Sequence, residues 1–258
     1  MDRVVTSDGT AVAVHTFEPP TAAEGLPTVV LQHGFAADTQ TNWVAPGVVA
    51  ALRTAGRRVV SVDARGHGES DKPHDPDRYG EGRMARDLVE VFDALGLTEL
   101  DLVGYSMGAI ISLVTATTER RVRRMVIGGV GGAVVDMGGV DRRTVDSSAL
   151  AAALRAEDRS TITNPGAKAF RRFADSTGAD LLALAAQAER VHRSPIALGS
   201  ITAPTRLVVG EADPLASRPE RLVAAIPGAE LVVVPGNHLR AVGAAEFAPA
   251  IVDFLAVR

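Results

Sequence analysis

Apolar and polar positions over the first 130 residues alternate between two patterns, which predict strands and helices in turn. Short continuous apolar runs are typical of strands buried on both faces, as in a parallel sheet. Such runs occupy residues 27–33, 59–63, 100–103 and 122–130. Between the runs, apolar residues recur every three or four positions, as on one face of a helix. That spacing predicts helices over residues 44–55 and 84–95, and another that begins at residue 107.

The ends of the chain complete this pattern. Residues 4–5 and 12–17 alternate around Ser7-Asp8-Gly9, which predicts a hairpin. Near the other end, residues 204–210 and 230–235 read as strands, and helices are expected at 219–225 and from Phe247 onward. Strands and helices that alternate in this way are joined by right-handed crossovers. We therefore predict an α/β fold with a mostly parallel, doubly wound sheet and helices on both faces.

The alternation stops between residues 131 and 199, where helical patterns dominate and strands are scarce. Leu150 and Leu154, then Phe170 and Phe173, then residues 181–184 mark three candidate helices. A long irregular connection is the alternative, but such loops are uncommon in compact domains. We interpret the segment as a small inserted helical cap. The predicted organisation is a first core part (residues 1–130), the cap (131–199) and a second core part (200–258).

Composition narrows the functional classes. The chain has 258 residues, a formal net charge of −4 and no cysteine, and it contains no basic cluster typical of nucleic-acid binding. The absence of cysteine excludes disulfides and fits a reducing compartment. No apolar run approaches membrane-spanning length, and no signal peptide is recognisable, so we expect a cytoplasmic protein. No metal-ligand cluster or phosphate-binding loop is present, and no metal or organic cofactor is expected.

One segment carries candidate chemistry. Gly104-Tyr105-Ser106-Met107-Gly108 lies between a predicted strand and a predicted helix and fits the pattern G-x-S-x-G. A serine on such a turn points its hydroxyl out of the sheet, and the flanking glycines leave room for neighbouring backbone. The amides and dipole of the following helix favour negative charge there. We predict that Ser106 is a nucleophile; the alternative is a glycine-rich turn with an incidental serine.

A serine hydroxyl needs a base to accept its proton and a group to orient that base. Such groups gather where parallel strands end at one edge of a sheet. Asp213 and His238 each follow the end of a predicted strand. We predict His238 as the base and Asp213 as the orienting carboxylate, in the chain order Ser, Asp, His. Glu211 and Asp136 are alternative carboxylates.

The developing oxyanion of an acyl-transfer reaction requires preorganised hydrogen-bond donors. One expected donor is the backbone N–H of Met107, directly after the serine. The other is the backbone N–H of Phe35, which follows the first parallel strand, with Gly34 permitting the necessary turn. His33 is expected to brace this loop rather than to act in catalysis.

Five segments occur in the order in which they occur in the α/β-hydrolase superfamily. They are His33-Gly34-Phe35, residues 63–70, Gly104 to Gly108, residues 210–213, and Gly236-Asn237-His238. The chain resembles the capped, single-domain branch, which includes carboxylesterases, carbon–carbon bond hydrolases, cofactor-free haloperoxidases, haloalkane dehalogenases and epoxide hydrolases. The resemblance covers nearly all of the chain except the cap. It implies that the loop around Arg65 and His67 is a structural turn.

The resemblance also makes some reactions of this superfamily less compatible with the sequence than others. Dehalogenases and epoxide hydrolases of this superfamily carry aspartate where this chain has Ser106, and epoxide opening there also uses cap tyrosines. The tyrosines here, Tyr79 and Tyr105, lie outside the predicted cap. The resemblance therefore favours a carboxylesterase-like serine hydrolase that cleaves a small or medium acyl ester through an acyl-enzyme on Ser106. Carbon–carbon hydrolysis of a ring-cleavage product, perhydrolysis with the same triad, and a non-catalytic, ligand-binding role stay open.

Substrate choice is expected to depend on the cap and on the pocket beneath it. The candidate lining residues, each of which could instead be core, are Phe35, Tyr105, Met107, Met137, Phe170 and Leu239. The cap is rich in alanine and leucine and contains no tryptophan, which favours an apolar acyl or aryl group. The expected partner is a small-molecule acyl ester or a related carbonyl compound. The sequence does not predict an oligomeric state.

Overall fold

A computed structural model describes residues 1–21, 23, 25–141 and 143–256. Within them, eight strands form one sheet in the order β1-β2-β4-β3-β5-β6-β7-β8. The strands are β1 (Asp2–Val5), β2 (Ala11–Phe17), β3 (Thr28–Gln32), β4 (Val59–Asp63), β5 (Leu100–Tyr105), β6 (Val122–Gly128), β7 (Thr205–Gly210) and β8 (Glu230–Val234). Strands β1 and β2 form the predicted hairpin, β2 runs antiparallel to β4, and all other neighbours are parallel. The predicted mostly parallel α/β sheet is confirmed.

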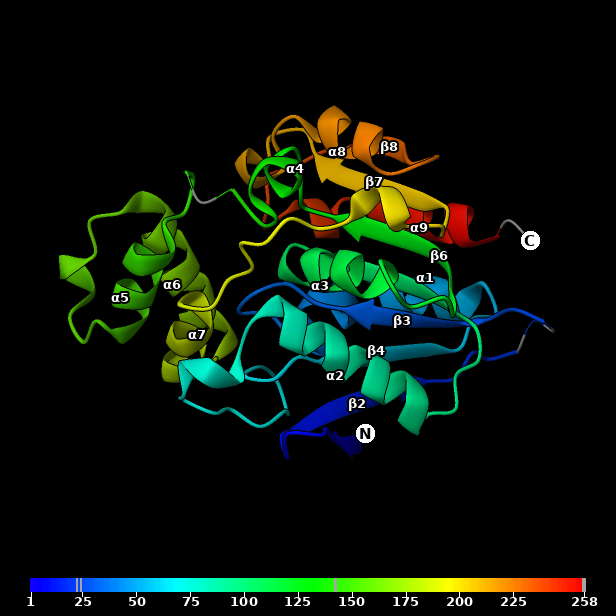
Figure 1. Cartoon of the computed structure of the whole chain (residues 1–258), viewed down its shortest axis with the longest axis horizontal. Helices are drawn as coiled ribbons and strands as arrows, with labels where there is room; N and C mark the ends of the chain where they lie inside the picture. The colour runs from blue at the N-terminus through cyan, green and yellow to red at the C-terminus, as the bar shows by residue number, and fades with distance from the viewer. Residues whose placement is uncertain (22, 24, 142, 257–258) are drawn as a thin grey trace.

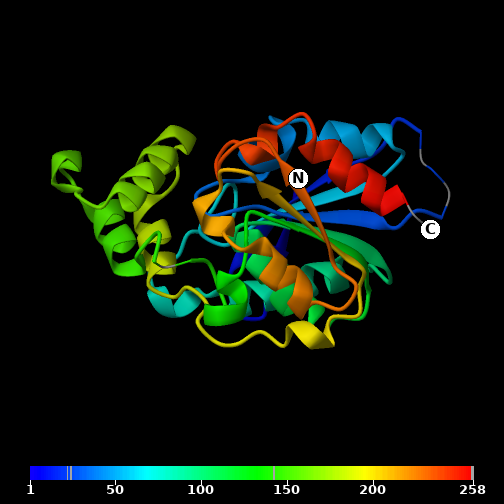
Figure 2. The same ribbon diagram turned by 90° about the horizontal axis from the view of Figure 1, so that it is seen from above.

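Helices cover both faces of the sheet (Figures 1 and 2). One face carries α1 (Val48–Thr54) and α9 (Phe247–Ala256), and the other carries α2 (Glu81–Ala94), α3 (Met107–Ala116) and α8 (Pro219–Ala225). Successive residues of a strand point to opposite faces. Accordingly Val30 packs in the core on the α2–α3 side, whereas Val29 and Leu31 pack on the α1–α9 side. This double burial explains the continuous apolar runs in the sequence.

Three helices stand beside the ends toward which the parallel strands point (Figures 1 and 2). They are α5 (Ser147–Arg155), α6 (Pro165–Thr177) and α7 (Leu181–Ala188), and they form a hydrophobic cluster that also includes Ala36 and Leu215 from the loops after β3 and β7. Each begins at a polar residue whose side chain accepts hydrogen bonds from first-turn backbone N–H groups: Asp146, Asn164 and Asp180. Such caps stabilise helix starts, and they explain why this segment folds into short, separate helices.

The fourth helix of the predicted cap segment, α4 (Ala133–Met137), lies beside α8 over the sheet and not with α5–α7 (Figure 1). The predicted cap limits of residues 131–199 therefore stay a prediction. Arg142, within those limits, and residues 257–258 of the predicted second core part lie outside the described residues.

Two predicted elements have different limits in the structure, and in each case a glycine with positive φ lies at the changed limit. The helix expected over residues 44–55 is divided into a π-helical segment, Gln40–Val44, and α1, with Gly47 at φ 87° between them. The strand expected to reach residue 130 ends at Gly128, and Gly129 follows at φ 67°. A positive φ fits neither a helix nor a strand and is readily adopted by glycine. Among the described residues, every helix is too short or too polar to cross a lipid bilayer.

Candidate active site

Ser106 occupies a sharp turn between β5 and α3. Its backbone has φ 53° and ψ −115°, and its N–H donates a 2.8 Å hydrogen bond to the carbonyl oxygen of Gly128. A positive φ is costly for a residue with a side chain and persists only where the surroundings hold it. A Cβ on Gly108 would lie 2.0 Å from the carbonyl oxygen of Gln32, and one on Gly104 would lie 2.3 Å from the carbonyl oxygen of Gly108. The two glycines are thus required by crowding around the turn.

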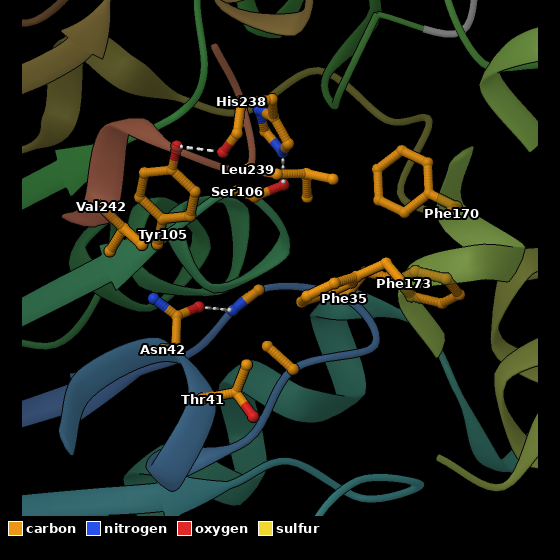
Figure 3. Close-up of a pocket in the computed structure, with 12 residues that line it drawn as sticks. Phe35, Thr41, Asn42, Tyr105, Ser106, Phe170, Phe173, His238, Leu239 and Val242 are labelled. Carbon is orange, nitrogen blue, oxygen red and sulfur yellow. Dashed lines mark hydrogen bonds between the residues drawn. The ribbon is translucent and has the colours of Figure 1, made fainter. Parts of the chain in front are cut away.

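The structure brings Ser106, His238 and Asp213 together from the ends of β5, β8 and β7. The distance from His238 Nε2 to Ser106 Oγ is 2.9 Å, and from His238 Nδ1 to Asp213 Oδ2 it is also 2.9 Å (Figure 3). All three residues are buried. Because a carboxylate only accepts hydrogen bonds, the proton lies on Nδ1, and Nε2 is left to accept the hydrogen bond from the serine hydroxyl.

Asp213 is held by its own local structure. Its Oδ1 accepts a 2.9 Å hydrogen bond from the N–H of Leu215 at the start of a short 3₁₀ turn. The alternative carboxylates lie elsewhere: Glu211 is exposed, and Asp136 is exposed and forms ion pairs with Arg218 and Arg221. Of the three acidic candidates, Asp213 alone hydrogen-bonds His238 among the described residues.

The Phe35 and Met107 backbone N–H groups border the same serine. Both residues line a cavity that includes Ser106, and a Cβ on Gly34 would lie 3.4 Å from the Ser106 Cβ. Within the described part of the chain, neither N–H donates a hydrogen bond to another group. Unpaired N–H groups at the start of a helix and in an adjacent turn are suited to bind negative charge.

Neighbouring groups fix the loop that carries Phe35. The N–H of Gly34 donates to Asn42 Oδ1 at 2.9 Å, and the N–H of Ala36 donates to His67 Nε2 at 3.2 Å (Figure 3 shows the first). Burial lowers the pKa of His67 to about 3, so the ring is neutral at physiological pH and can accept this hydrogen bond. No sequence pattern identified Asn42, because its role depends on a contact formed only by the folded loop.

The loop after β4 also contacts the segment that carries Phe35, through His67 and Ala64. The fully buried guanidinium of Arg65 forms two hydrogen bonds of 2.7 and 2.8 Å with the Asp87 carboxylate. His33, also fully buried, accepts from the N–H of Ala64 at 2.9 Å through Nε2 and donates to the carbonyl oxygen of Gly34 at 2.8 Å through Nδ1. Burial lowers the pKa of His33, in agreement with this neutral form. His33 is therefore occupied in holding backbone, and the Arg65 guanidinium is occupied by the Asp87 carboxylate.

Two small cavities meet at Ser106. The first, of about 70 Å³, is lined by His238 and by the predicted residues Tyr105, Phe170 and Leu239. The second, of about 60 Å³, extends toward α5 and α7. Phe35 and Phe170 line both, with ring centroids 6.0 Å apart at 69°. Residues that the sequence did not identify also line the first cavity: Thr41, Asn42, Phe173 and Val242 (Figure 3).

Met137, one of the predicted pocket residues, lines neither of the two cavities at Ser106. Met137 is the last residue of α4, and α4 packs beside α8 instead of joining α5–α7. Its position in the cap segment suggested proximity to the site. Only the packing of α4 decides on which side of the molecule it lies.

Residues 27–146 match a family model described as "alpha/beta hydrolase fold". The crystal structure of a hydrolase from Pseudomonas aeruginosa PA01 is similar over 99% of this chain and 98% of that chain, with a TM-score of 0.76 and 27% sequence identity. The chain belongs to the α/β-hydrolase superfamily. The family match includes Phe35, Ser106 and Met107, while Asp213 and His238 lie beyond it.

Curated relatives of this α/β-hydrolase match it over part of its length. A Bacillus subtilis (strain 168) protein, named as a 2-succinyl-6-hydroxy-2,4-cyclohexadiene-1-carboxylate synthase, is 36% identical over 126 residues, which are 48% of this chain and 43% of that protein. The mouse (Mus musculus) sn-1-specific diacylglycerol lipase ABHD11 is 42% identical over 92 residues, 35% of this chain and 28% of the lipase. The chain thus spans less than half the length of each of these two relatives.

Proposed function

We propose that this α/β-hydrolase is a serine hydrolase that cleaves a small or medium acyl ester through an acyl-enzyme on Ser106. The observation that carries the proposal is the continuous hydrogen-bonded chain from Asp213 through His238 to Ser106. This series of hydrogen bonds ends at the Ser106 hydroxyl, which is flanked by the N–H groups of Phe35 and Met107; neither N–H has an acceptor among the described residues. A hydroxyl, a base, an orienting carboxylate and two donors are the groups that acyl transfer requires.

The first half of the reaction forms the acyl-enzyme. His238 Nε2 takes the proton from Ser106 Oγ as that oxygen attacks the carbonyl carbon of the ester. The carbonyl oxygen becomes an oxyanion and accepts hydrogen bonds from the two free N–H groups. When the carbonyl re-forms, the bond to the alcohol oxygen breaks, and the alcohol leaves with the proton from Nε2.

The second half releases the acid. A water molecule gives a proton to His238 Nε2 while its oxygen attacks the acyl carbon, and the oxyanion forms again beside the same two donors. The bond to Ser106 Oγ then breaks, and the serine oxygen recovers the proton. Asp213 stays unprotonated throughout and stabilises the positive charge that His238 carries transiently.

The two tyrosines support this reaction over epoxide opening. The hydroxyl of Tyr79 donates to the carbonyl oxygen of Pro73 at 2.6 Å, and that of Tyr105 donates to the carbonyl oxygen of His238 at 2.7 Å. Both side chains are buried. Neither hydroxyl belongs to α5–α7 or is free to polarise an epoxide oxygen, and Ser106 occupies the turn where an aspartate nucleophile would be required.

We further infer that α5–α7 act as a cap over the site. Support comes from α6, whose Phe170 lines both cavities and lies with its ring centroid 6.3 Å from that of His238. Phe170 and Phe173 approach the site from the cap side, opposite Tyr105 and Val242 (Figure 3). Substrate contacts distant from the reacting carbonyl would therefore come mainly from this layer.

A fluorophosphonate probe combined with a substrate panel tests the proposal. The expected labelling result is covalent modification of Ser106 that is lost in Ser106→Ala. In the substrate panel, hydrolysis of p-nitrophenyl esters should be faster than both the cleavage of a ring-cleavage dienoate and the formation of peracetic acid. The exposed Ser176→Ala variant is the control and should label normally. Folded protein that is neither labelled nor active on any ester would overturn the proposal and favour a ligand-binding role. If carbon–carbon cleavage or perhydrolysis is faster than ester hydrolysis, the same triad would be assigned to that reaction instead.

A further inference from the structure

The second cavity at Ser106 combines an apolar wall with buried polar groups. Its apolar lining comes mainly from Met107, the cap and nearby loops: Val140, Val145, Leu150, Ala188, Val191 and Leu215. Besides Ser106, its polar lining residues are Glu81, Ser147 and Gln187, all of them buried. A pocket that served only to hold an alkyl chain would gain nothing from these three side chains.

Gln187, on α7, is 1% exposed. Its Nε2 contacts the thioether sulfurs of Met107 and Met84, which are weak acceptors. Its Oε1 has no hydrogen-bond partner among the described residues. A buried acceptor without a donor is costly, and an exception of this kind requires a reason such as a ligand. The contact with Met107 places this amide directly beside the residue that follows Ser106.

Glu81 supplies the second polar group. It is the first residue of α2, and its carboxylate accepts a 2.6 Å hydrogen bond from the N–H of His192, in the segment that follows α7. Burial raises the pKa of Glu81 to about 7, and within the described residues no cationic side chain lowers it again. Near neutral pH a large share of the molecules therefore carries a protonated Glu81, which can donate a hydrogen bond as well as accept one.

The position of His238 determines which part of the substrate occupies each of the two cavities. The departing alcohol must take its proton from His238 Nε2, so the alcohol lies on the side of Ser106 that faces His238. His238 lines the first cavity and not the second. The acyl group consequently extends into the second cavity, past Met107 and toward Gln187.

We propose that the second cavity is the acyl pocket, and that Gln187 together with Glu81 binds a hydroxyl group carried by the acyl chain. This inference rests on the proposed function and narrows its substrates to hydroxyacyl esters. A hydroxyl fits both partners, since it donates to Gln187 Oε1 and accepts from protonated Glu81. A carboxylate offers Gln187 Oε1 no donor. An ammonium would require ionised Glu81 and the burial of a charged pair in an otherwise apolar pocket.

Paired ethyl esters test this proposal. Each ω-hydroxy ester from butanoate to octanoate is compared with the unsubstituted ester in which a methyl group replaces the hydroxyl, and kcat/KM is measured by pH-stat. The wild type is expected to prefer the hydroxy ester by about tenfold at one chain length, the effect of one or two hydrogen bonds. Gln187→Leu should remove that preference, so that the kcat/KM ratio of each pair of esters approaches one.

Control variants separate recognition from structure. Gln32→Leu makes the same change at a buried position on β3 outside both cavities and should leave the preference ratio unchanged. Gln187→Met provides a second apolar variant in case Gln187→Leu does not fold. A wild type without preference at any chain length, or Gln187 variants with the wild-type ratio, would overturn the acyl-pocket proposal. A wild type that hydrolyses no ester and is not labelled by the fluorophosphonate probe would instead overturn the proposed function.

Discussion

The hydroxyl of Tyr105 donates a 2.7 Å hydrogen bond to the backbone carbonyl oxygen of His238, 133 positions further along the chain (Figure 3). Tyr105 is the last residue of β5 and directly precedes Ser106, so this hydrogen bond ties the serine turn to the loop that carries the imidazole. The two rings also lie 5.5 Å apart. Burial raises the pKa of Tyr105, which keeps the hydroxyl protonated and able to donate.

Tyr105→Phe should therefore weaken the alignment of Ser106 and His238. The carbonyl oxygen of His238 would lose its donor in a buried site, which costs about 1–3 kcal/mol of stability. We expect kcat for a p-nitrophenyl ester to fall about tenfold with a smaller change in KM. Tyr79→Phe is the matched control, since it deletes a similar hydrogen bond to Pro73 and neither residue lines the two cavities at Ser106. Equal kcat values for the two variants would show that Tyr105 has no positioning role.

Ser106→Ala should abolish esterase activity and leave the fold intact, because the hydroxyl makes its hydrogen bond only to His238 among the described residues. The checks are p-nitrophenyl ester turnover and circular dichroism. Normal esterase activity in this variant would refute the assignment of the nucleophile.

Asp213→Asn should lower kcat by about 10⁴, because an amide can donate to Nδ1 and so favours the wrong tautomer of His238. The measurement is kcat on the same ester, with folding checked by thermal unfolding. Asp136→Asn changes the exposed alternative carboxylate in the same way and should retain wild-type kcat. A large loss in Asp136→Asn together with an active Asp213→Asn would reverse the assignment.

Gly108→Ala should prevent formation of the serine turn, because the added Cβ would collide with the backbone of Gln32. Neither backbone can move far inside a packed sheet, so we expect a loss of several kcal/mol in the free energy of unfolding and little active protein. Gly82→Ala, on helix α2 with open space around the added Cβ, should instead stabilise the protein by ~0.5–1 kcal/mol. Chemical denaturation compares the two, and a stable, active Gly108→Ala would contradict the crowding argument.

Glu81→Gln should stabilise the protein in a pH-dependent way. The pKa of Glu81 is raised from 4.5 to about 7 in the folded protein, so the folded state keeps a proton that the unfolded chain loses. The stability of the wild type therefore declines as the pH rises from 4.5 to about 7 and is level above that range with respect to this group. Glutamine does not ionise, so the advantage of the variant should grow across this window to ~3 kcal/mol.

Urea unfolding at several pH values measures this difference. Glu157→Gln makes the same change at an exposed position and is the control. A difference between Glu81→Gln and wild type that stays constant with pH would mean that Glu81 ionises equally in the folded and unfolded states.

Much of this architecture follows from local patterns. The continuous apolar runs predicted the parallel strands because β3 and β5 are buried on both faces, and α2 followed from apolar residues at helical spacing. Element limits were wrong where glycines at positive φ, such as Gly47 and Gly129, interrupt a run that is otherwise compatible with helix or strand. The position of α4 was not predictable, since its apolar residues could have packed against either the cap or α8.

By itself, the sequence determined the order of strands and helices, the tight turn around Ser106, and the candidate residues at the strand ends. Those features depend on neighbouring residues: backbone freedom at glycine, apolar periodicity, and the rule that parallel strands end at one edge. Only the tertiary structure decided that Tyr105 and Asn42 hold backbone and that Met137 lines neither cavity at Ser106. It also decided that the buried Gln187 Oε1 has no donor among the described residues. These features depend on contacts between segments far apart in the chain, which no local pattern encodes.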